Sequence, residues 1–257
     1  MKKKIKQPLT IEQKIRTRRI LSFSVFIVFI FAGIAGWRYL YTLPSNLPEG
    51  QNTRVPLRKV LDGNEKVFSM LTLSNNHLAK TFPKEKAVKK PRVNGMYGLR
   101  NDADTTNWQL HLVKANGDTI TITLDSIKAL PKTEIVFDFK CIEGWSQVTH
   151  WSGVRFSDFV KHYGLGKEGA MNYVGLITPD KQYYVGIDMP SALHPQTLLC
   201  YEMNGEPLPV KQGYPLRLII PTKYGIKSLK RIGTICFSNQ RPKDYWAEQG
   251  YDYYSGL

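Results

Sequence analysis

Residues 133–146 read Thr-Glu-Ile-Val-Phe-Asp-Phe-Lys-Cys-Ile-Glu-Gly-Trp-Ser, and this stretch predicts a buried strand that runs into a loop. Ile135, Phe137 and Phe139 alternate along the strand, and Cys141 continues their parity. We therefore expect the thiol to point to the same side of the sheet as these apolar side chains. A cysteine in such a register is usually a small core residue, but a thiolate at the mouth of a strand is also a ligand for a soft metal.

A second informative segment lies some seventy positions later, at residues 212–230: Gln-Gly-Tyr-Pro-Leu-Arg-Leu-Ile-Ile-Pro-Thr-Lys-Tyr-Gly-Ile-Lys-Ser-Leu-Lys. The apolar run at 216–220 predicts a strand, and a glycine-containing turn rich in cations follows it. Cations on a turn usually form a solvated face, and Arg217 within the strand is equally suited to pair with a carboxylate. Consecutive backbone N–H groups, a hydroxyl and an ammonium also converge well on phosphate oxygens. A metal carried on a phosphorylated organic cofactor would need such a turn together with the thiolate.

These two segments together resemble the molybdopterin-binding domain of the sulfite oxidase superfamily, most closely that of bacterial periplasmic protein-methionine-sulfoxide reductases. The resemblance extends from about Ser74 to Pro242. It implies that Cys141 is the catalytic residue and gives one thiolate to molybdenum, while the pterin dithiolene supplies two further sulfurs. Soft sulfur ligands suit a metal that must change its oxidation state.

The resemblance also implies which residues hold the molybdenum cofactor. Ser228, Leu229 and Lys230 match the turn that receives its terminal phosphate. The other positions that match cofactor contacts of the family are Asn75, Thr178, Gln212 and Arg217. Two departures from the family pattern occur: position 212 is commonly Asn, and close relatives carry a Tyr-Glu pair where this chain has Leu78 and Ala79. The second departure lies beside the expected site and bears on the substrate.

The remaining pattern predicts a strand-rich, mixed α+β domain, which agrees with the fold of that superfamily. Apolar residues alternate on either side of Asn116-Gly117, which predicts a hairpin over 108–124. A second hairpin is expected from 173–177 and 183–187, and a later strand from 232–237. Short helices are predicted at 125–130 and 156–163, the second with Ser157 as its cap and Gly164 as its stop.

The N-terminus predicts a membrane segment. Eighteen uncharged residues run from Ile20 to Trp37, which is about enough for one helix to cross a hydrocarbon core of about 30 Å. Eight Lys or Arg residues precede this run, so we expect residues 1–19 in the cytoplasm and the bulk of the chain outside. The alternative to a transmembrane anchor at 20–41 is a cleaved signal peptide, because small residues occur at Gly33-Ile34-Ala35.

Two features describe how this segment connects to the rest of the chain. Arg18-Arg19 forms a twin-arginine pattern, which suits a protein that is exported after it has folded around a cofactor. Residues 42–66 contain five Pro or Gly residues and few large apolar ones, so we predict an extended linker there. The molybdopterin-binding oxidoreductase domain is expected at 67–257.

Composition excludes several other classes of protein. The net charge is +15, but the first 41 residues hold nine Lys or Arg and one Glu, so the remaining 216 residues carry only +7. This charge is too diffuse to indicate nucleic-acid binding. The three cysteines are widely spaced, which excludes a disulfide framework and a CxxC pair, and the five histidines show no zinc spacing.

The sequence therefore predicts a membrane-tethered molybdenum oxidoreductase of the periplasm that transfers an oxygen atom. The resemblance favours reduction of a small-molecule or protein-bound sulfoxide, or of a similar S-oxide, with electrons from a membrane haem partner. The chain ends about fifteen residues after the last matching segment, with no room for the dimerisation domain of sulfite oxidases, so we expect a monomer. The alternatives are a sulfite-oxidising enzyme and a membrane-anchored binding or scaffolding domain that has this fold but no cofactor.

Overall fold

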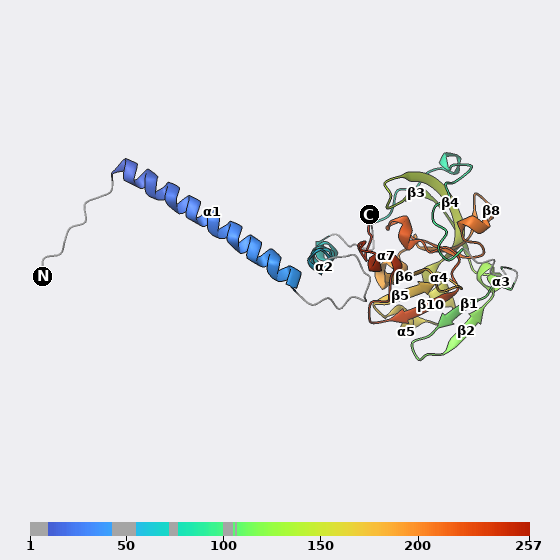
Figure 1. Ribbon diagram of the computed structural model, residues 1–257. Helices are drawn as coiled ribbons and strands as arrows, with labels where there is room; N and C mark the ends of the chain where they lie inside the picture. Colours follow the sequence, from blue (N-terminus) through green and yellow to red (C-terminus); the bar gives the residue numbers. More distant parts are fainter. Residues whose placement is uncertain (1–9, 43–54, 72–76, 100–104, 106) are drawn as a thin grey trace. The chain divides into compact units, whose positions relative to one another are not determined.

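The structure is a computed structural model that describes residues 10–42, 55–71, 77–99, 105 and 107–257 (Figure 1). The chain separates into two compact units, residues 1–62 and 63–257. Asn75, which the family resemblance predicts to contact the cofactor, lies outside the described residues.

Helix α1 (Ile11–Thr42) begins earlier than the predicted apolar run and includes four of the eight cations before it. The reason is a capping box: Thr10 and Gln13 exchange hydrogen bonds between side chain and main chain, at 3.0 and 3.3 Å. None of its residues is buried, and the helix is long and apolar enough to cross a membrane. The predicted spanning segment is therefore helical throughout.

Helix α2 (Val55–Leu71) corrects the prediction of an extended linker over 42–66. The sequence reasoning treated Pro56 and Gly63 as breakers of regular structure. Pro56 is the second residue of the helix, where its missing N–H would have no intrahelical partner, so it is tolerated. A single glycine inside a helix costs only about 1 kcal/mol relative to alanine.

The first sheet has five strands in the order β2-β1-β10-β5-β6, and all neighbours are antiparallel except the parallel pair β1 and β10. Both predicted hairpins are confirmed, because β1 pairs with β2 around Asn116-Gly117 and β5 pairs with β6. Gly117 has φ +89°, a conformation that glycine adopts without steric cost. The strands are β1 (Leu110–Val113), β2 (Thr119–Ile122), β5 (Tyr173–Ile177), β6 (Tyr184–Asp188) and β10 (Thr234–Ser238).

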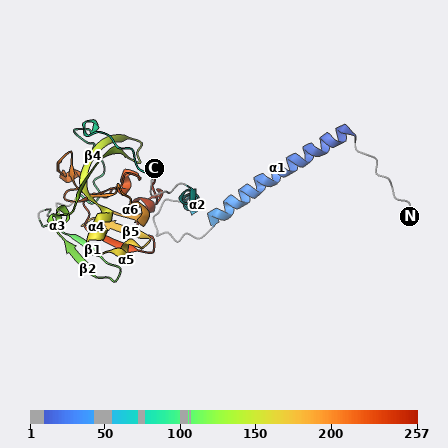
Figure 2. The ribbon, with the colours of Figure 1, turned by 180° about the vertical axis from the view of Figure 1, so that it is seen from behind.

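The second sheet is antiparallel and carries the segments that the sequence singled out. Strand β3 ends at Lys140, directly before Cys141, and β9 begins at Arg217. In the views of Figures 1 and 2 this sheet forms the upper part of the second unit and the first sheet the lower part. Its strands are β3 (Lys132–Lys140), β4 (Ser146–Arg155), β7 (Leu198–Met203), β8 (Glu206–Pro207) and β9 (Arg217–Ile219).

Short helices connect the strands. The prediction that Ser157 caps the second short helix is wrong, because Ser157 lies inside α4 (Phe156–His162), whose N-cap is Arg155. Its stop is as expected: Gly164 follows the helix with φ +65°. The other helical turns are α3 (Leu124–Lys128), α5 (Gly166–Gly169), α6 (Met189–Ala192), α7 (Tyr245–Glu248), η1 (Lys84–Lys86), η2 (Val210–Gln212) and η3 (Gly225–Lys227).

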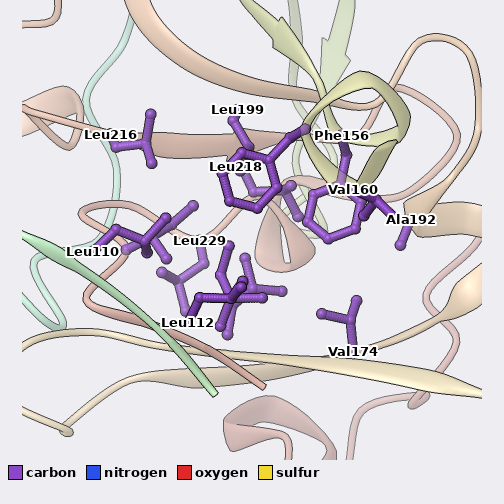
Figure 3. Packing of buried hydrophobic residues seen from close by; sticks show 14 of the residues in the cluster. Leu110, Leu112, Phe156, Val160, Val174, Ala192, Leu199, Leu216, Leu218 and Leu229 are labelled. Atoms are coloured by element: carbon purple, nitrogen blue, oxygen red, sulfur yellow. The ribbon is translucent and has the colours of Figure 1, made fainter. Parts of the chain in front are cut away.

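The larger hydrophobic core joins the two sheets, as Figure 3 shows for Leu110 and Leu112 of β1 and Leu199 and Leu218 of the second sheet. Phe156 of α4 completes this cluster.

The opposite face of the second sheet is also buried. Ile135, Phe137, Trp151, Leu198 and Ile219 form a separate smaller cluster there. Because side chains alternate along a strand, Arg217 of β9 shares this face with Ile219, while Leu218 between them points into the larger core. This face of the second sheet carries the candidate site.

Candidate active site

A pocket of about 340 Å³ opens on this face of the second sheet. Its walls come from segments that are distant in sequence: Cys141 after β3, Trp151 of β4, Arg217 of β9, residues 225–230, and residues 92–97. The two segments that carry the family resemblance therefore meet in one cavity.

Cys141 is the first residue of the tight loop between β3 and β4. Its N–H donates to the Trp145 carbonyl at 2.9 Å, and its carbonyl accepts from the Gly144 N–H at 3.0 Å. Gly144 has φ +88°, which this turn requires and which other residues seldom adopt. The thiol is free and 8% exposed, and it lines the pocket. The described residues contain no cluster of three or more His, Cys, Asp or Glu that holds a metal by itself.

Arg217 places a buried positive charge in the same pocket. Its Nη1 donates to the carbonyl of Gln212 at 2.9 Å and to the side-chain Oε1 at 3.1 Å, and its Nη2 donates to the Ser228 carbonyl at 3.2 Å. Burial lowers the pKa of Arg217 to about 10, which leaves the guanidinium charged at neutral pH. Among the described residues no carboxylate forms an ion pair with it.

Two buried polar atoms in the pocket have no hydrogen-bond partner among the described residues: Nε of Arg217 and Oγ of Ser228. Buried polar groups are nearly always paired in folded proteins, so such orphan groups are typical of a site that binds a ligand. Both are hydrogen-bond donors, which suits an anionic ligand.

Lys230 adds a second cation to this wall. Its Nζ donates to the carbonyls of Asn94 and Gly95, at 2.5 and 3.1 Å. Burial, together with the nearby charge of Arg217, lowers the pKa of Lys230 to about 7. The amine therefore titrates near neutral pH, and an anion beside it would favour the charged form.

Two other cations of the predicted turn point away from the pocket and are buried in ion pairs. Lys223 pairs with Asp188 at 2.8 Å and donates to the Tyr254 carbonyl, also at 2.8 Å. Lys227 pairs with Asp244. The alternative of a solvated face does not hold for these two lysines, which fasten the turn to β6 and to the C-terminal segment. Of the three lysines in this turn, Lys230 is the one that lines the pocket.

Two predicted cofactor contacts lie elsewhere. Thr178 is 1% exposed, and its hydroxyl is used in the β5–β6 turn, where it donates to Asp180 at 2.6 Å and accepts from the Tyr183 N–H at 3.1 Å. Leu229 is fully buried in the larger core, and its carbonyl accepts from the Leu218 N–H. Neither residue lines the pocket, and Asn75 lies outside the described residues.

The sequence reasoning missed the residues that close the pocket from the other side. Arg92, Asn94 and Tyr97 belong to a segment for which the sequence predicts no role in the site. Trp246 and Tyr251, near the C-terminus, also line the cavity. The one sequence signal of Tyr97, Trp246 and Tyr251 is that they are aromatic, and aromatic residues are equally typical of an ordinary core.

Comparisons with known proteins show which proteins this chain is similar to. The chain is 36% identical over 183 residues to a putative protein-methionine-sulfoxide reductase subunit, YedZ1, of Azospira oryzae, which covers 70% of this chain and 69% of that protein. It is 30% identical over 176 residues to the protein-methionine-sulfoxide reductase catalytic subunit MsrP of Campylobacter jejuni, which covers 62% of this chain and 59% of that protein. With MsrP of Xanthomonas axonopodis the identity is 33%, over 43% of that protein.

Among solved structures, the sulfane dehydrogenase SoxCD from Paracoccus pantotrophus matches with a TM-score of 0.50 and 14% identity, over 65% of this chain and 46% of that one. At this identity the match supports the fold alone. Residues 97–246 match the family model described as the oxidoreductase molybdopterin binding domain. The chain therefore belongs to this family of molybdopterin-binding oxidoreductases, which has the sulfite oxidase fold.

Proposed function

We propose that this chain is a membrane-tethered, molybdenum-cofactor-dependent oxidoreductase of the periplasm that reduces a sulfoxide or a similar S-oxide. The observation that carries the proposal is the convergence of one free thiol, one buried guanidinium without a carboxylate partner and one orphan hydroxyl in a single pocket. Bound there, the molybdenum cofactor supplies the two-electron change that transfer of one oxygen atom requires.

The residues present fit this cofactor. Cys141 offers a soft sulfur ligand at the mouth of β3, where the turn through Gly144 holds it in place. Arg217, Ser228 and Lys230 offer charge and hydrogen-bond donors for the phosphate. Gln212 orients Arg217, because it accepts from the guanidinium through both its main chain and its side chain.

Three further contacts stay predictions from the family resemblance. The structure puts the hydroxyl of Thr178 and the side chain of Leu229 outside the pocket lining. Asn75 belongs to residues that the structure does not describe.

The substrate class is supported by the names of the relatives, two of which are called protein-methionine-sulfoxide reductase catalytic subunits. The chain spans 59% and 43% of the length of those two proteins, so their whole activity is carried over here only as a proposal. Reduction of a sulfoxide to a thioether consumes two electrons and two protons and releases water. The electrons come, in this proposal, from a haem protein in the membrane, and the enzyme acts as a monomer.

The proposed location depends on α1. The eight cations before its apolar run support an N-terminus in the cytoplasm and a catalytic domain in the periplasm. A cleaved signal peptide would release the same domain into the periplasm. In spheroplasts, external protease should degrade the catalytic domain, and protection of that domain would contradict this orientation.

Metal analysis and a substrate screen test the function. Protein purified from its own host should hold close to one molybdenum atom per chain, together with the pterin phosphate. With a reduced viologen dye as electron donor, sulfoxides should be consumed faster than N-oxides, and sulfite with an oxidised dye should react slowly or not at all. Molybdenum far below one atom per chain would favour a scaffolding domain, and a preference for sulfite would reverse the proposed direction.

A further inference from the structure

A segment of the chain, residues 81–95, crosses the β3–β4 hairpin and ends at the pocket; we call it the strap. The Phe82 N–H donates to the Val136 carbonyl at 2.9 Å, and the Val88 N–H donates to the Val148 carbonyl at 3.0 Å. These main-chain bonds fix the path of the strap across the two strands. They bring its last residues to the loop that contains the thiol.

Two residues expected to bind the cofactor hold the pocket end of the strap. Gln212 donates from Nε2 to the Arg92 carbonyl at 3.2 Å. Lys230 donates to the carbonyls of Asn94 and Gly95. The main chain around Asn94 is therefore held on both sides, by Gln212 and by Lys230.

The carboxamide of Asn94 points at the sulfur of Cys141, with 3.7 Å between Nδ2 and Sγ. The same amide also forms a hydrogen bond with the carboxylate of Glu143. The Trp145 indole also donates to Glu143, at 3.1 Å. Because a sulfur and a carboxylate oxygen are both acceptors, the amide nitrogen, and not the amide oxygen, must face them.

We infer that Asn94 is a positioning residue for the sulfur of Cys141, and that its N–H···S bond raises the reduction potential of the metal which this sulfur binds. The inference rests on the proposed function, in which Cys141 is the metal ligand. A hydrogen bond to a ligating sulfur withdraws charge from it, so the sulfur donates less to the metal and the reduced state becomes more favourable. Asn94 reaches no metal itself and acts through Cys141.

The test is a redox titration of the purified holoenzyme, followed by the Mo(V) electron paramagnetic resonance signal. In Asn94→Leu, which keeps the size of the side chain but has no donor, the Mo(VI)/Mo(V) midpoint should fall. At a fixed solution potential we expect the ratio of oxidised to reduced metal to change by roughly tenfold. This change is equivalent to a shift of about 59 mV in the midpoint for one electron. The signal should also change its g values, because the sulfur donates more strongly to the metal.

Asn204 provides a matched control, because it fastens the strap without approaching the thiol. Its Nδ2 donates to the Val88 carbonyl at 3.1 Å, and its φ of +54° is one that glycine accepts. Asn204→Gly should therefore loosen the strap and leave the midpoint and the g values unchanged. An equal shift in Asn204→Gly would mean that strap attachment, and not the N–H···S bond, sets the potential.

The remaining outcomes show whether the proposed function fails or only the inference about Asn94 fails. If the wild-type protein holds no molybdenum, the proposed function fails. If the wild type holds the metal and Asn94→Leu has the same midpoint and the same signal as the wild type, this inference fails and the proposed function stands. If Asn94→Leu does not load the metal, Asn94→Ala decides, because it lacks the donor, adds no bulk and leaves the charge unchanged: a lowered midpoint supports the inference, and an unchanged one overturns it.

Discussion

The guanidinium of Arg217 lies over the indole of Trp151, with 4.5 Å between the guanidinium carbon and the ring centroid. Both side chains are 2% exposed, and both occupy the pocket face of the second sheet. Three hydrogen bonds to oxygen atoms of Gln212 and Ser228 hold the cation in place without neutralising it. The pocket therefore keeps a preorganised positive charge, which is available to an anionic group.

Arg217→Met should reduce the molybdenum and pterin content of the purified protein by at least tenfold, because it keeps most of the side-chain volume and removes the charge. Arg217→Lys should lie between this variant and the wild type, since lysine restores the charge but lacks the planar fork of donors. The control is Arg155→Met at an exposed position outside the pocket, which should load normally. Normal cofactor content in Arg217→Met would remove Arg217 from the site.

Cys141→Ala should abolish molybdenum binding, because it removes the ligand that the chain supplies. Inductively coupled plasma mass spectrometry on protein from the native host measures this directly. Cys236→Ser is the matched control: this cysteine is also free, is partly buried and does not line the pocket. Full metal content and activity in Cys141→Ala would show that the ligand assignment is wrong.

Gly225→Ala should destabilise the protein and deform the pocket. A Cβ at this position would lie 2.5 Å from Cζ of Phe139, whose ring lines the cavity, so the ring must shift. Such overpacking costs roughly 1–3 kcal/mol of unfolding free energy. Gly166→Ala meets no atom within 4 Å and should be neutral or slightly stabilising. Denaturant unfolding of both variants checks this, and equal stabilities would contradict the close contact.

The stability of the cofactor-free protein should increase as the pH rises above about 7. The pKa of Lys230 is lowered to about 7 in the folded state, whereas the unfolded chain holds this proton until the ordinary lysine value, near 10.5. Between these two values the unfolded state binds more protons, so the free energy of unfolding rises with pH. Lys223, whose pKa burial lowers to about 8, contributes in the same direction at a slightly higher pH.

Denaturant unfolding between pH 6 and 9 measures this dependence, and Lys230→Met should flatten its lower part. The comparison concerns the slope with pH, because the variant also loses the hydrogen bonds to the strap. A wild-type slope of zero or of opposite sign would mean that Lys230 stays charged in the folded, cofactor-free protein. In that case the strap carbonyls would stabilise the ammonium more than burial penalises it.

Much of the site could be predicted because its two key segments carry local signals. The alternation of Ile135, Phe137 and Phe139 fixes the side to which Cys141 points, and the glycine after it marks the turn. The apolar run around Arg217 likewise marks β9. The wrong prediction of an extended linker over 42–66 has a local cause too. Proline interrupts a helix in its interior but not in its first turn, and Pro56 lies in the first turn of α2.

The sequence by itself determined the hairpins, the apolar N-terminal helix and the strand that ends at Cys141, because alternation, turn residues and caps act over a few neighbouring positions. Only the tertiary structure decided which residues meet around the thiol: Asn94 lies 47 positions from Cys141 and 136 positions from Lys230 in the chain. It also decided that Lys227 is buried against Asp244, 17 positions away, while Lys230 lines the pocket. The physical reason is that charge and polarity are local properties of a residue, whereas burial and the choice of partner depend on which distant segments the two sheets bring together.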